Sequence, residues 1–85
     1  MAIFLKKIYS KEDESYLYGY DLTGHPYLGS EFIVTVGLDL DGLSLHEALE
    51  SLYKFRGTIY RFKSRTDCLK IFDTKLSGNS IKYRN

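Results

Sequence analysis

The sequence predicts an α+β fold in which a small antiparallel sheet of about four strands is covered on one face by a capped helix. Three segments within residues 2–39 alternate side chains with a period of two, which is typical of strands. Residues 44–57 instead carry a helix start signal followed by apolar residues at helical spacing. The predicted order is therefore three strands, a helix, a fourth strand and a final short helix or strand.

The first two strands are expected over residues 2–10 and 15–22. Alternation in the first is imperfect, because Lys7 shares a face with Ile3, Leu5 and Tyr9. The second places one apolar set on a single face: Tyr16, Tyr18, Tyr20 and Leu22. We expect this tyrosine face to point into the core, because no charged residue interrupts it.

Residues 23–30 form a predicted loop, since they hold two glycines and the single proline of the chain. The third strand is expected over residues 31–39. Its alternation of Phe32, Val34 and Val36 with Ile33 and Thr35 is the clearest in the chain. A turn at Asp41-Gly42 then ends the strand.

Ser44 and Glu47 have the spacing of a capping box, in which each side chain satisfies the other residue's backbone N–H. The helix is predicted over residues 45–56, with Gly57 as its C-terminal cap. Its apolar stripe consists of Leu45, Ala48, Leu49, Leu52 and Phe55.

The last third of the chain begins with a predicted strand over residues 58–64, in which Tyr60 and Phe62 face away from Arg61. Residues 67–76 have two interpretations: a helix capped by Thr66 or Asp67 and stopped at Gly78, or a strand paired with 58–64. The helical spacing of the apolar residues fits better. Residues 80–84 are expected to form a short strand or a frayed terminus.

Length and composition indicate one domain over residues 1–85. Cys68 is the single cysteine, so an intrachain disulfide is excluded and a reducing compartment fits. No apolar run approaches the roughly 20 residues needed to cross a bilayer. The N-terminal lysines follow the apolar stretch instead of preceding it, unlike a secretory signal. We therefore expect a cytoplasmic protein with no membrane association.

The residue pattern does not predict an enzyme, a cofactor or a metal site. His25 and His46 have no second ligand at metal-binding spacing, and Cys68 lies on an apolar stripe, where it acts as a small hydrophobe. The Asp39–Gly42 segment lacks the remaining ligands of a calcium loop. An enzymatic role would require a pocket where one of the histidines meets a carboxylate.

Charge is divided along the chain. Residues 1–42 hold three basic and seven acidic residues, a net charge of −4, whereas residues 43–85 hold nine basic and four acidic residues, a net charge of +5. Such a division steers a charged partner only if folding keeps the two sets apart.

The leading functional hypothesis is a non-catalytic protein–protein interaction module that binds a host or cellular protein. Eight tyrosines support it, because tyrosine is favoured at binding hot spots. The expected contact residues are the loop residues His25, Tyr27 and Leu28 and the acidic residues Glu12, Asp13 and Glu14. Small, neutral, tyrosine-rich chains of this kind are common among phage and mobile-element proteins that block a host protein, which suggests an inhibitor.

The alternative hypothesis is nucleic-acid binding through a basic segment interleaved with aromatic residues. Its basic residues are Lys54, Arg56, Arg61, Lys63 and Arg65. This hypothesis requires that the positive side chains form one patch. An edge strand at 2–10 or 58–64 would also permit a homodimer by sheet extension.

Overall fold

The computed structural model describes residues 2–77, except for the side chains of the last two. It contains a four-stranded antiparallel sheet with the strand order β1-β2-β3-β4 and two helices, which confirms the α+β prediction. In chain order the elements are β1 (Ile3–Ser10), β2 (Ser15–Asp21), β3 (Phe32–Val36), α1 (Leu45–Lys54), β4 (Ile59–Phe62) and α2 (Arg65–Ser77).

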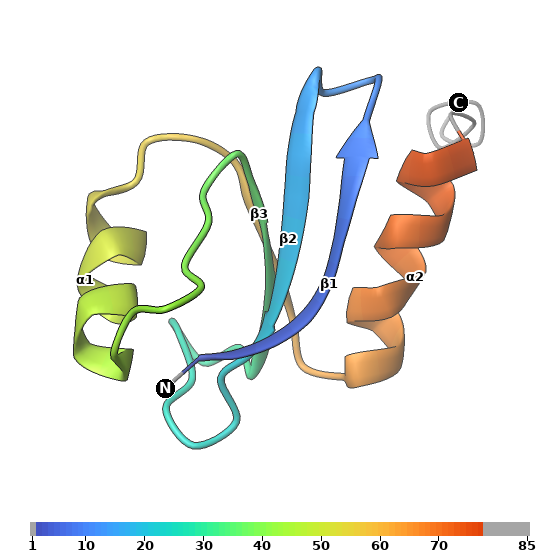
Figure 1. Ribbon diagram of the computed structural model, residues 1–85. Coiled ribbons are helices and arrows are strands. Elements are labelled where there is room, and N and C mark those ends of the chain that lie inside the picture. Colours follow the sequence, from blue (N-terminus) through green and yellow to red (C-terminus); the bar gives the residue numbers. More distant parts are fainter. Residues whose placement is uncertain (1, 78–85) are drawn as a thin grey trace.

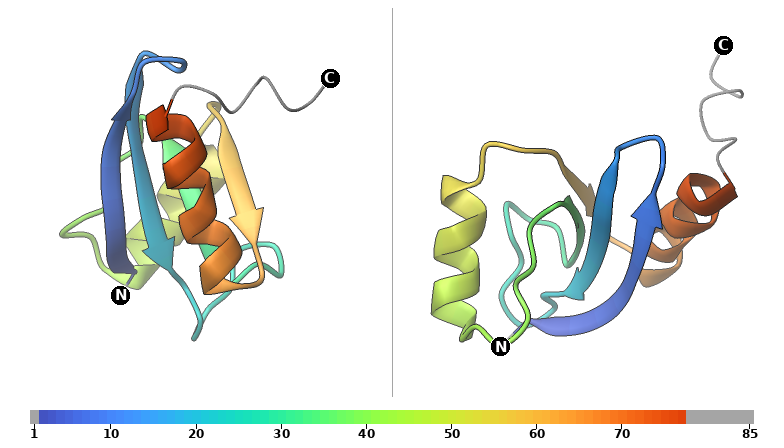
Figure 2. Two further views of the ribbon diagram at one scale, coloured as in Figure 1. Left: turned by 90° about the vertical axis from the view of Figure 1, so that its right-hand side faces the viewer. Right: turned by 45° about the horizontal axis from the view of Figure 1, so that its top comes forward.

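The two helices lie on opposite faces of the sheet, α1 on one side and α2 on the other (Figures 1 and 2). The expectation of one helix on one face was therefore incomplete. The helical interpretation of residues 67–76 is confirmed, because Cys68 and Phe72 share a helix face that is fully buried. The predicted cap was wrong: the Ser64 hydroxyl accepts the backbone N–H of Asp67 at 3.0 Å.

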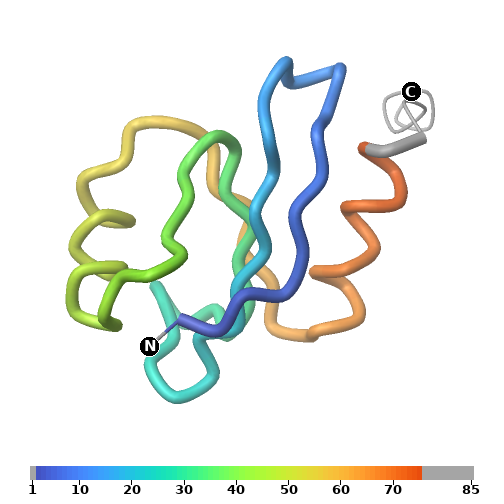
Figure 3. Tube along the Cα trace, viewed as in Figure 1, coloured from blue at the N-terminus to red at the C-terminus, as the bar shows by residue number. Residues whose placement is uncertain are grey.

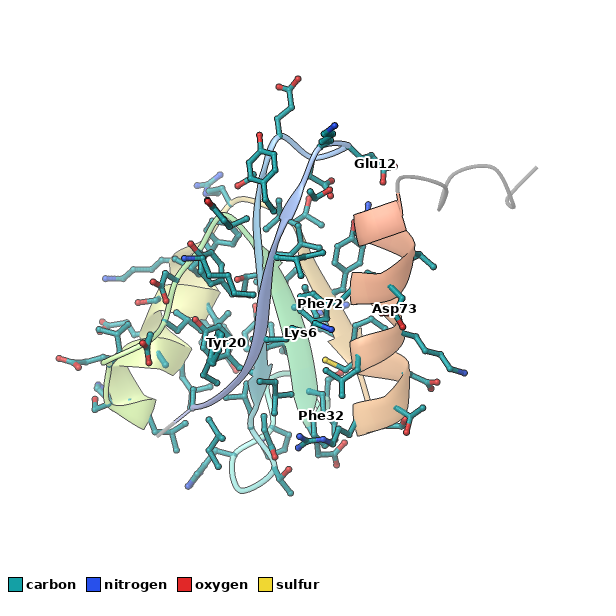
Figure 4. The ribbon with its side chains drawn as sticks, turned by 45° about the vertical axis from the view of Figure 1, so that its right-hand side comes forward. Lys6, Glu12, Tyr20, Phe32, Phe72 and Asp73 are labelled. Atoms are coloured by element: carbon teal, nitrogen blue, oxygen red, sulfur yellow. The ribbon has the colours of Figure 1, made fainter. Side chains whose placement is uncertain are left out.

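Each face of the sheet has its own apolar core. Tyr20 lies on the α1 side and Phe72 covers the other side, as Figure 4 shows. The buried residues of the first core are Tyr20, Leu22, Tyr27, Ile33, Leu40, Ala48 and Leu52. Those of the second core are Leu17, Val34, Cys68 and Phe72.

The capping box at the start of α1 is confirmed. The backbone N–H of Ser44 donates to Glu47 Oε1 at 3.0 Å, and the N–H of Glu47 donates to Ser44 Oγ at 3.2 Å. These bonds hold the pKa of the Glu47 carboxyl below its usual value. The prediction that Gly57 caps the C-terminus of this helix was wrong. The helix ends at Lys54, and Phe55 is its cap: its backbone is extended, and its N–H donates to the Leu52 carbonyl.

Helix α1 stands further from the sheet than α2 does. No Cα atom of α1 lies within 8 Å of a strand Cα, whereas α2 approaches all four strands that closely. The segment 37–44 runs between α1 and the β1–β2 hairpin, as the tube in Figure 3 shows. Leu40 from this segment is 1% exposed and fills the space.

A register shift between Phe4 and Lys6 in β1 makes Leu5 an extra residue opposite β2, which is a β-bulge. The bulge corrects the predicted faces of this strand. Leu5 packs against the second core, whereas Lys7 and Tyr9 lie opposite Tyr18 and Tyr16.

The third and fourth strands are shorter than predicted. Strand β3 stops before Gly37, whose φ of 85° lies in the left-handed region and turns the chain away. In β4 the predicted alternation is confirmed, since Tyr60 and Phe62 pack on the second core while Arg61 is exposed. The element expected over residues 80–84 lies outside the described residues.

Candidate functional site

Four side chains at the outer end of the β1–β2 hairpin form a largely aromatic surface, which we call the hairpin tyrosine face; three of them are exposed and Tyr18 is half-buried against the first core. It consists of Lys7, Tyr9, Tyr16 and Tyr18. Cross-strand pairing brings them together, because Lys7 lies opposite Tyr18 and Tyr9 opposite Tyr16. Tyr9 is 48% exposed and Tyr16 is 45% exposed.

The rings of this face order one another. The centroids of Tyr9 and Tyr16 lie 5.2 Å apart at an interplanar angle of 76°, an edge-to-face contact, and Tyr18 lies 6.3 Å from Tyr16. The Lys7 ammonium lies 4.6 Å from the Tyr16 ring centroid and 5.5 Å from that of Tyr18. At an exposed site each such cation–π contact contributes about 0.5–1 kcal/mol. The surface is therefore partly ordered before it meets a ligand.

Helix α1 is too short to reach the hairpin tip, where Tyr9 and Tyr16 are exposed. Its 10 residues span about 15 Å, whereas the 8 residues of β1 span about 26 Å. Figure 1 shows the hairpin tip extending beyond α1. The expectation that the tyrosine face of β2 points into the core is thus correct for buried Tyr20 and Leu22 and wrong for Tyr16, while Tyr18 is half-buried against the same core. The sequence did contain a signal for the exposure of Tyr16, because the predicted helix is shorter than the predicted strands that it covers.

The turn at the hairpin tip, residues 11–14, carries three acidic side chains and is joined to α2 by ion pairs, and we call it the acidic turn. Lys75 Nζ lies 3.0 Å from Glu12 Oε1 and 3.3 Å from Asp13 Oδ2, and the Lys75 side chain is only 10% exposed. Burial by itself lowers the pKa of Lys75, but hydrogen bonds to Glu12, Tyr60 and Asp13 outweigh it and raise the pKa. A basic residue of the C-terminal half therefore pairs here with two acidic residues of the N-terminal half.

The loop 23–30 differs from the expected exposed anchor. His25 and Leu28 are exposed, Leu28 by 57% with a positive φ of 49°. Tyr27, however, is 7% exposed, so the expectation of an exposed ring was wrong. Its hydroxyl donates to the Leu52 carbonyl at 3.3 Å and its ring packs 5.1 Å from that of Tyr53, which fixes the loop to α1.

The basic residues of the nucleic-acid hypothesis are all exposed, but they are spread along the chain around β4. Arg56 precedes this strand and Lys63 follows it, and four strand residues span about 13 Å. Lys54 pairs with Glu50 at 3.5 Å. The Tyr60 and Phe62 rings pack on the second core, on the face away from Arg61. The arrangement therefore lacks a surface where these rings and charges act together.

His25 and Asp21 line one shallow pocket of about 260 Å³, together with Ile3, Leu22, Thr23, Gly24 and Leu45. One oxygen of Asp21 already accepts both the backbone N–H and the hydroxyl of Thr23. Cys68 is a poor nucleophile, because burial raises the pKa of its thiol to about 11 and so disfavours the reactive thiolate. Within residues 2–77, no group of three or more His, Cys, Asp or Glu side chains is placed to hold a metal ion.

No protein-family model, curated protein or solved structure matches this chain. Among the helices in the described part of the chain, none is long and apolar enough to span a membrane. The candidate site therefore rests on geometry alone. Among the exposed aromatic side chains of the described residues, Tyr9 and Tyr16 are the pair whose rings contact each other, and both belong to the hairpin tyrosine face.

Proposed function

We propose that the protein is a non-catalytic protein–protein interaction module that binds its partner through the hairpin tyrosine face. The observation that carries this proposal is the mutual packing of Tyr9, Tyr16 and Tyr18 at the end of the hairpin, where the Tyr9 and Tyr16 side chains are nearly half exposed. Tyrosine contributes a large contact area and a polar hydroxyl at a low cost in conformational entropy. Rings already held by their neighbours lose less freedom on binding.

The surroundings of the face favour a protein partner over a nucleic acid. The acidic turn lies at the tip of the same hairpin, next to the Ser10–Ser15 pair, and Glu14 is exposed there. Exposed Glu14 and Lys7 carry opposite charges, so the charge around the rings is mixed, which suits a protein surface better than a row of phosphates. An inhibitor that covers a functional surface of its partner would act in this way without turnover.

The proposal is tested by capture from a host lysate with three forms of the tagged protein, with and without nuclease. These are the wild type, the double variant Tyr9→Thr with Tyr16→Thr, and the control Tyr53→Thr. Threonine keeps strand propensity, and Tyr53 is 63% exposed on α1. Circular dichroism first confirms that all three are folded.

We expect a protein that the wild type and the control retain in the presence of nuclease and that the double variant loses. Its affinity for the purified double variant should fall at least about tenfold, as for the loss of a hot spot. Equal capture by all three forms would exclude this face as the binding site. Capture that nuclease abolishes would instead favour nucleic-acid binding.

A further inference from the structure

The two edges of the sheet are unequal. Strand β4 has four residues and exposed basic side chains on and next to it, such as Arg61 and Lys63, and both features discourage further strand pairing. Strand β1 has eight residues, and within residues 2–77 it pairs with β2 alone. Its outer edge is therefore the longer and less protected template for an added strand.

Strand β1 also concentrates exposed apolar side chains. Ile3 is 57% exposed, Phe4 is 47% exposed and Tyr9 is 48% exposed, so three of the six large exposed hydrophobic residues lie on this strand. Phe4 packs edge-on against buried Tyr20, with ring centroids 6.1 Å apart, so its position is fixed. A strand added beside β1 would cover these side chains as well as the backbone edge.

A second copy of this chain is a poor occupant of that edge. In a symmetric dimer, two antiparallel β1 strands would be related by a twofold axis. When that axis passes through the centre of β1, either Lys6 lies opposite Lys6 of the second copy or Lys7 lies opposite Lys7. Like charges directly opposite one another destabilise a strand pair.

Lys7 makes the outer edge of β1 favour a strand that carries an acidic residue. It lies on the hairpin tyrosine face, beside Tyr9 on one side and Phe4 on the other, and its side chain is exposed. Lys6 points to the opposite face, with its ammonium 5.9 Å from the centroid of the Phe72 ring. A carboxylate on an added strand directly opposite Lys7 would form a cross-strand ion pair flanked by apolar contacts.

We propose that the partner binds by adding an extended segment to the outer edge of β1, with an acidic residue opposite Lys7 and apolar residues two positions away on each side. This inference rests on the proposed function and names the partner's chemistry. The backbone of the segment supplies hydrogen bonds along β1, and the alternate side chains that face Phe4, Lys7 and Tyr9 supply specificity.

The test is a selection of displayed random eight-residue peptides on the immobilised full-length protein. Selected peptides are then synthesised and titrated against the wild type, Lys7→Glu and the control Lys70→Glu. Lys70 is exposed on α2, so the control makes the same charge change on another surface. Amide hydrogen exchange of the complex, read by NMR, reports which backbone groups become protected.

We expect selected peptides with an acidic residue between two apolar ones at alternate positions. Lys7→Glu should weaken them about five- to tenfold and favour the matched lysine peptide, whereas Lys70→Glu should leave both affinities unchanged. Amides on the outer edge of β1 should become protected. Failure to select binders, or affinities unaffected by Lys7→Glu, would overturn the inference. A dimer in solution with protected β1 amides would assign the edge to a second copy instead.

The two proposals fail separately. If a captured partner depends on Tyr9 and Tyr16 but leaves the β1 amides unprotected, the hairpin tyrosine face is the binding site and strand addition is wrong. If the partner depends on neither the tyrosines nor Lys7, both proposals are wrong.

Discussion

Replacing Tyr20 by Phe tests the network that joins β2 to the segment before α1. The Tyr20 side chain is fully buried, and its hydroxyl donates to Asp39 Oδ1 at 3.0 Å while accepting the backbone N–H of Leu40 at 2.7 Å. The substitution removes one oxygen and changes the shape of the core very little. The buried N–H of Leu40 then loses its partner, whereas exposed Asp39 can turn to water.

An unpaired buried donor costs about 1–3 kcal/mol, so the free energy of unfolding should fall by that amount in Tyr20→Phe. Tyr16→Phe is the matched control, since it is the same change on the same strand at a residue that is 45% exposed. We expect the control to change stability by less than about 0.5 kcal/mol. Urea unfolding followed by circular dichroism measures both differences.

The difference in the free energy of unfolding between the wild type and Tyr20→Phe should also depend on pH. Burial, and further Asp39, raise the pKa of Tyr20 in the folded protein above its usual value of 10.0. The folded state therefore keeps a proton that the unfolded state releases above about pH 10. The stabilisation by Tyr20 is fully present below that pH and falls by about 1.4 kcal/mol per pH unit above it.

Phenylalanine has no such proton, so the two stabilities should converge as the pH rises from 10 to 11. Equal stability of wild type and Tyr20→Phe at pH 7 would contradict this account. A loss in Tyr16→Phe as large as that in Tyr20→Phe would do the same, because it would place the effect in the phenol itself and not in the buried network.

Three further predictions concern the second core and its borders. Gly19→Val should lower the free energy of unfolding by about 1–3 kcal/mol, because a Cβ at this position would lie 2.9 Å from the Phe72 ring. The control Gly24→Val should not lower it by this amount, because the space around Gly24 is open. Lys75→Met should cost about 1–2 kcal/mol in urea unfolding, a value between those of exposed and buried ion pairs. Because the pKa of Lys75 is raised in the fold, this difference should persist up to its unfolded pKa of about 10.4 and decrease as the pH rises further, through the raised pKa of the folded protein. Cys68, with its buried thiol, should react with a disulfide reagent only after unfolding, and rapid reaction of the native protein would contradict the packing of α2.

Local signals in the sequence determined much of the secondary structure. The capping box at Ser44 and Glu47 was visible because its two partners lie three residues apart, within reach of each other in any helix start. The same holds for the alternation in β2, β3 and β4 and for the helical spacing of residues 67–76. These features depend on short stretches of chain, so their periodicity can be recognised in the sequence without knowledge of the tertiary contacts.

Only the tertiary structure decided which of those faces are covered. The bulge at Leu5 arises from pairing with β2 and reverses the faces of Lys7 and Tyr9, which no property of β1 alone encodes. Whether a tyrosine is core or surface depends on where the helices end: Tyr20 lies beneath α1, while Tyr16, four residues earlier, lies beyond it. Tyr27 is buried because it packs in the core with α1, where the backbone carbonyl of Leu52, 25 residues away, accepts a hydrogen bond from its hydroxyl. The periodicity of a strand assigns a side chain to a face, but burial of that face depends on distant segments, and the candidate site is the part that those segments leave uncovered.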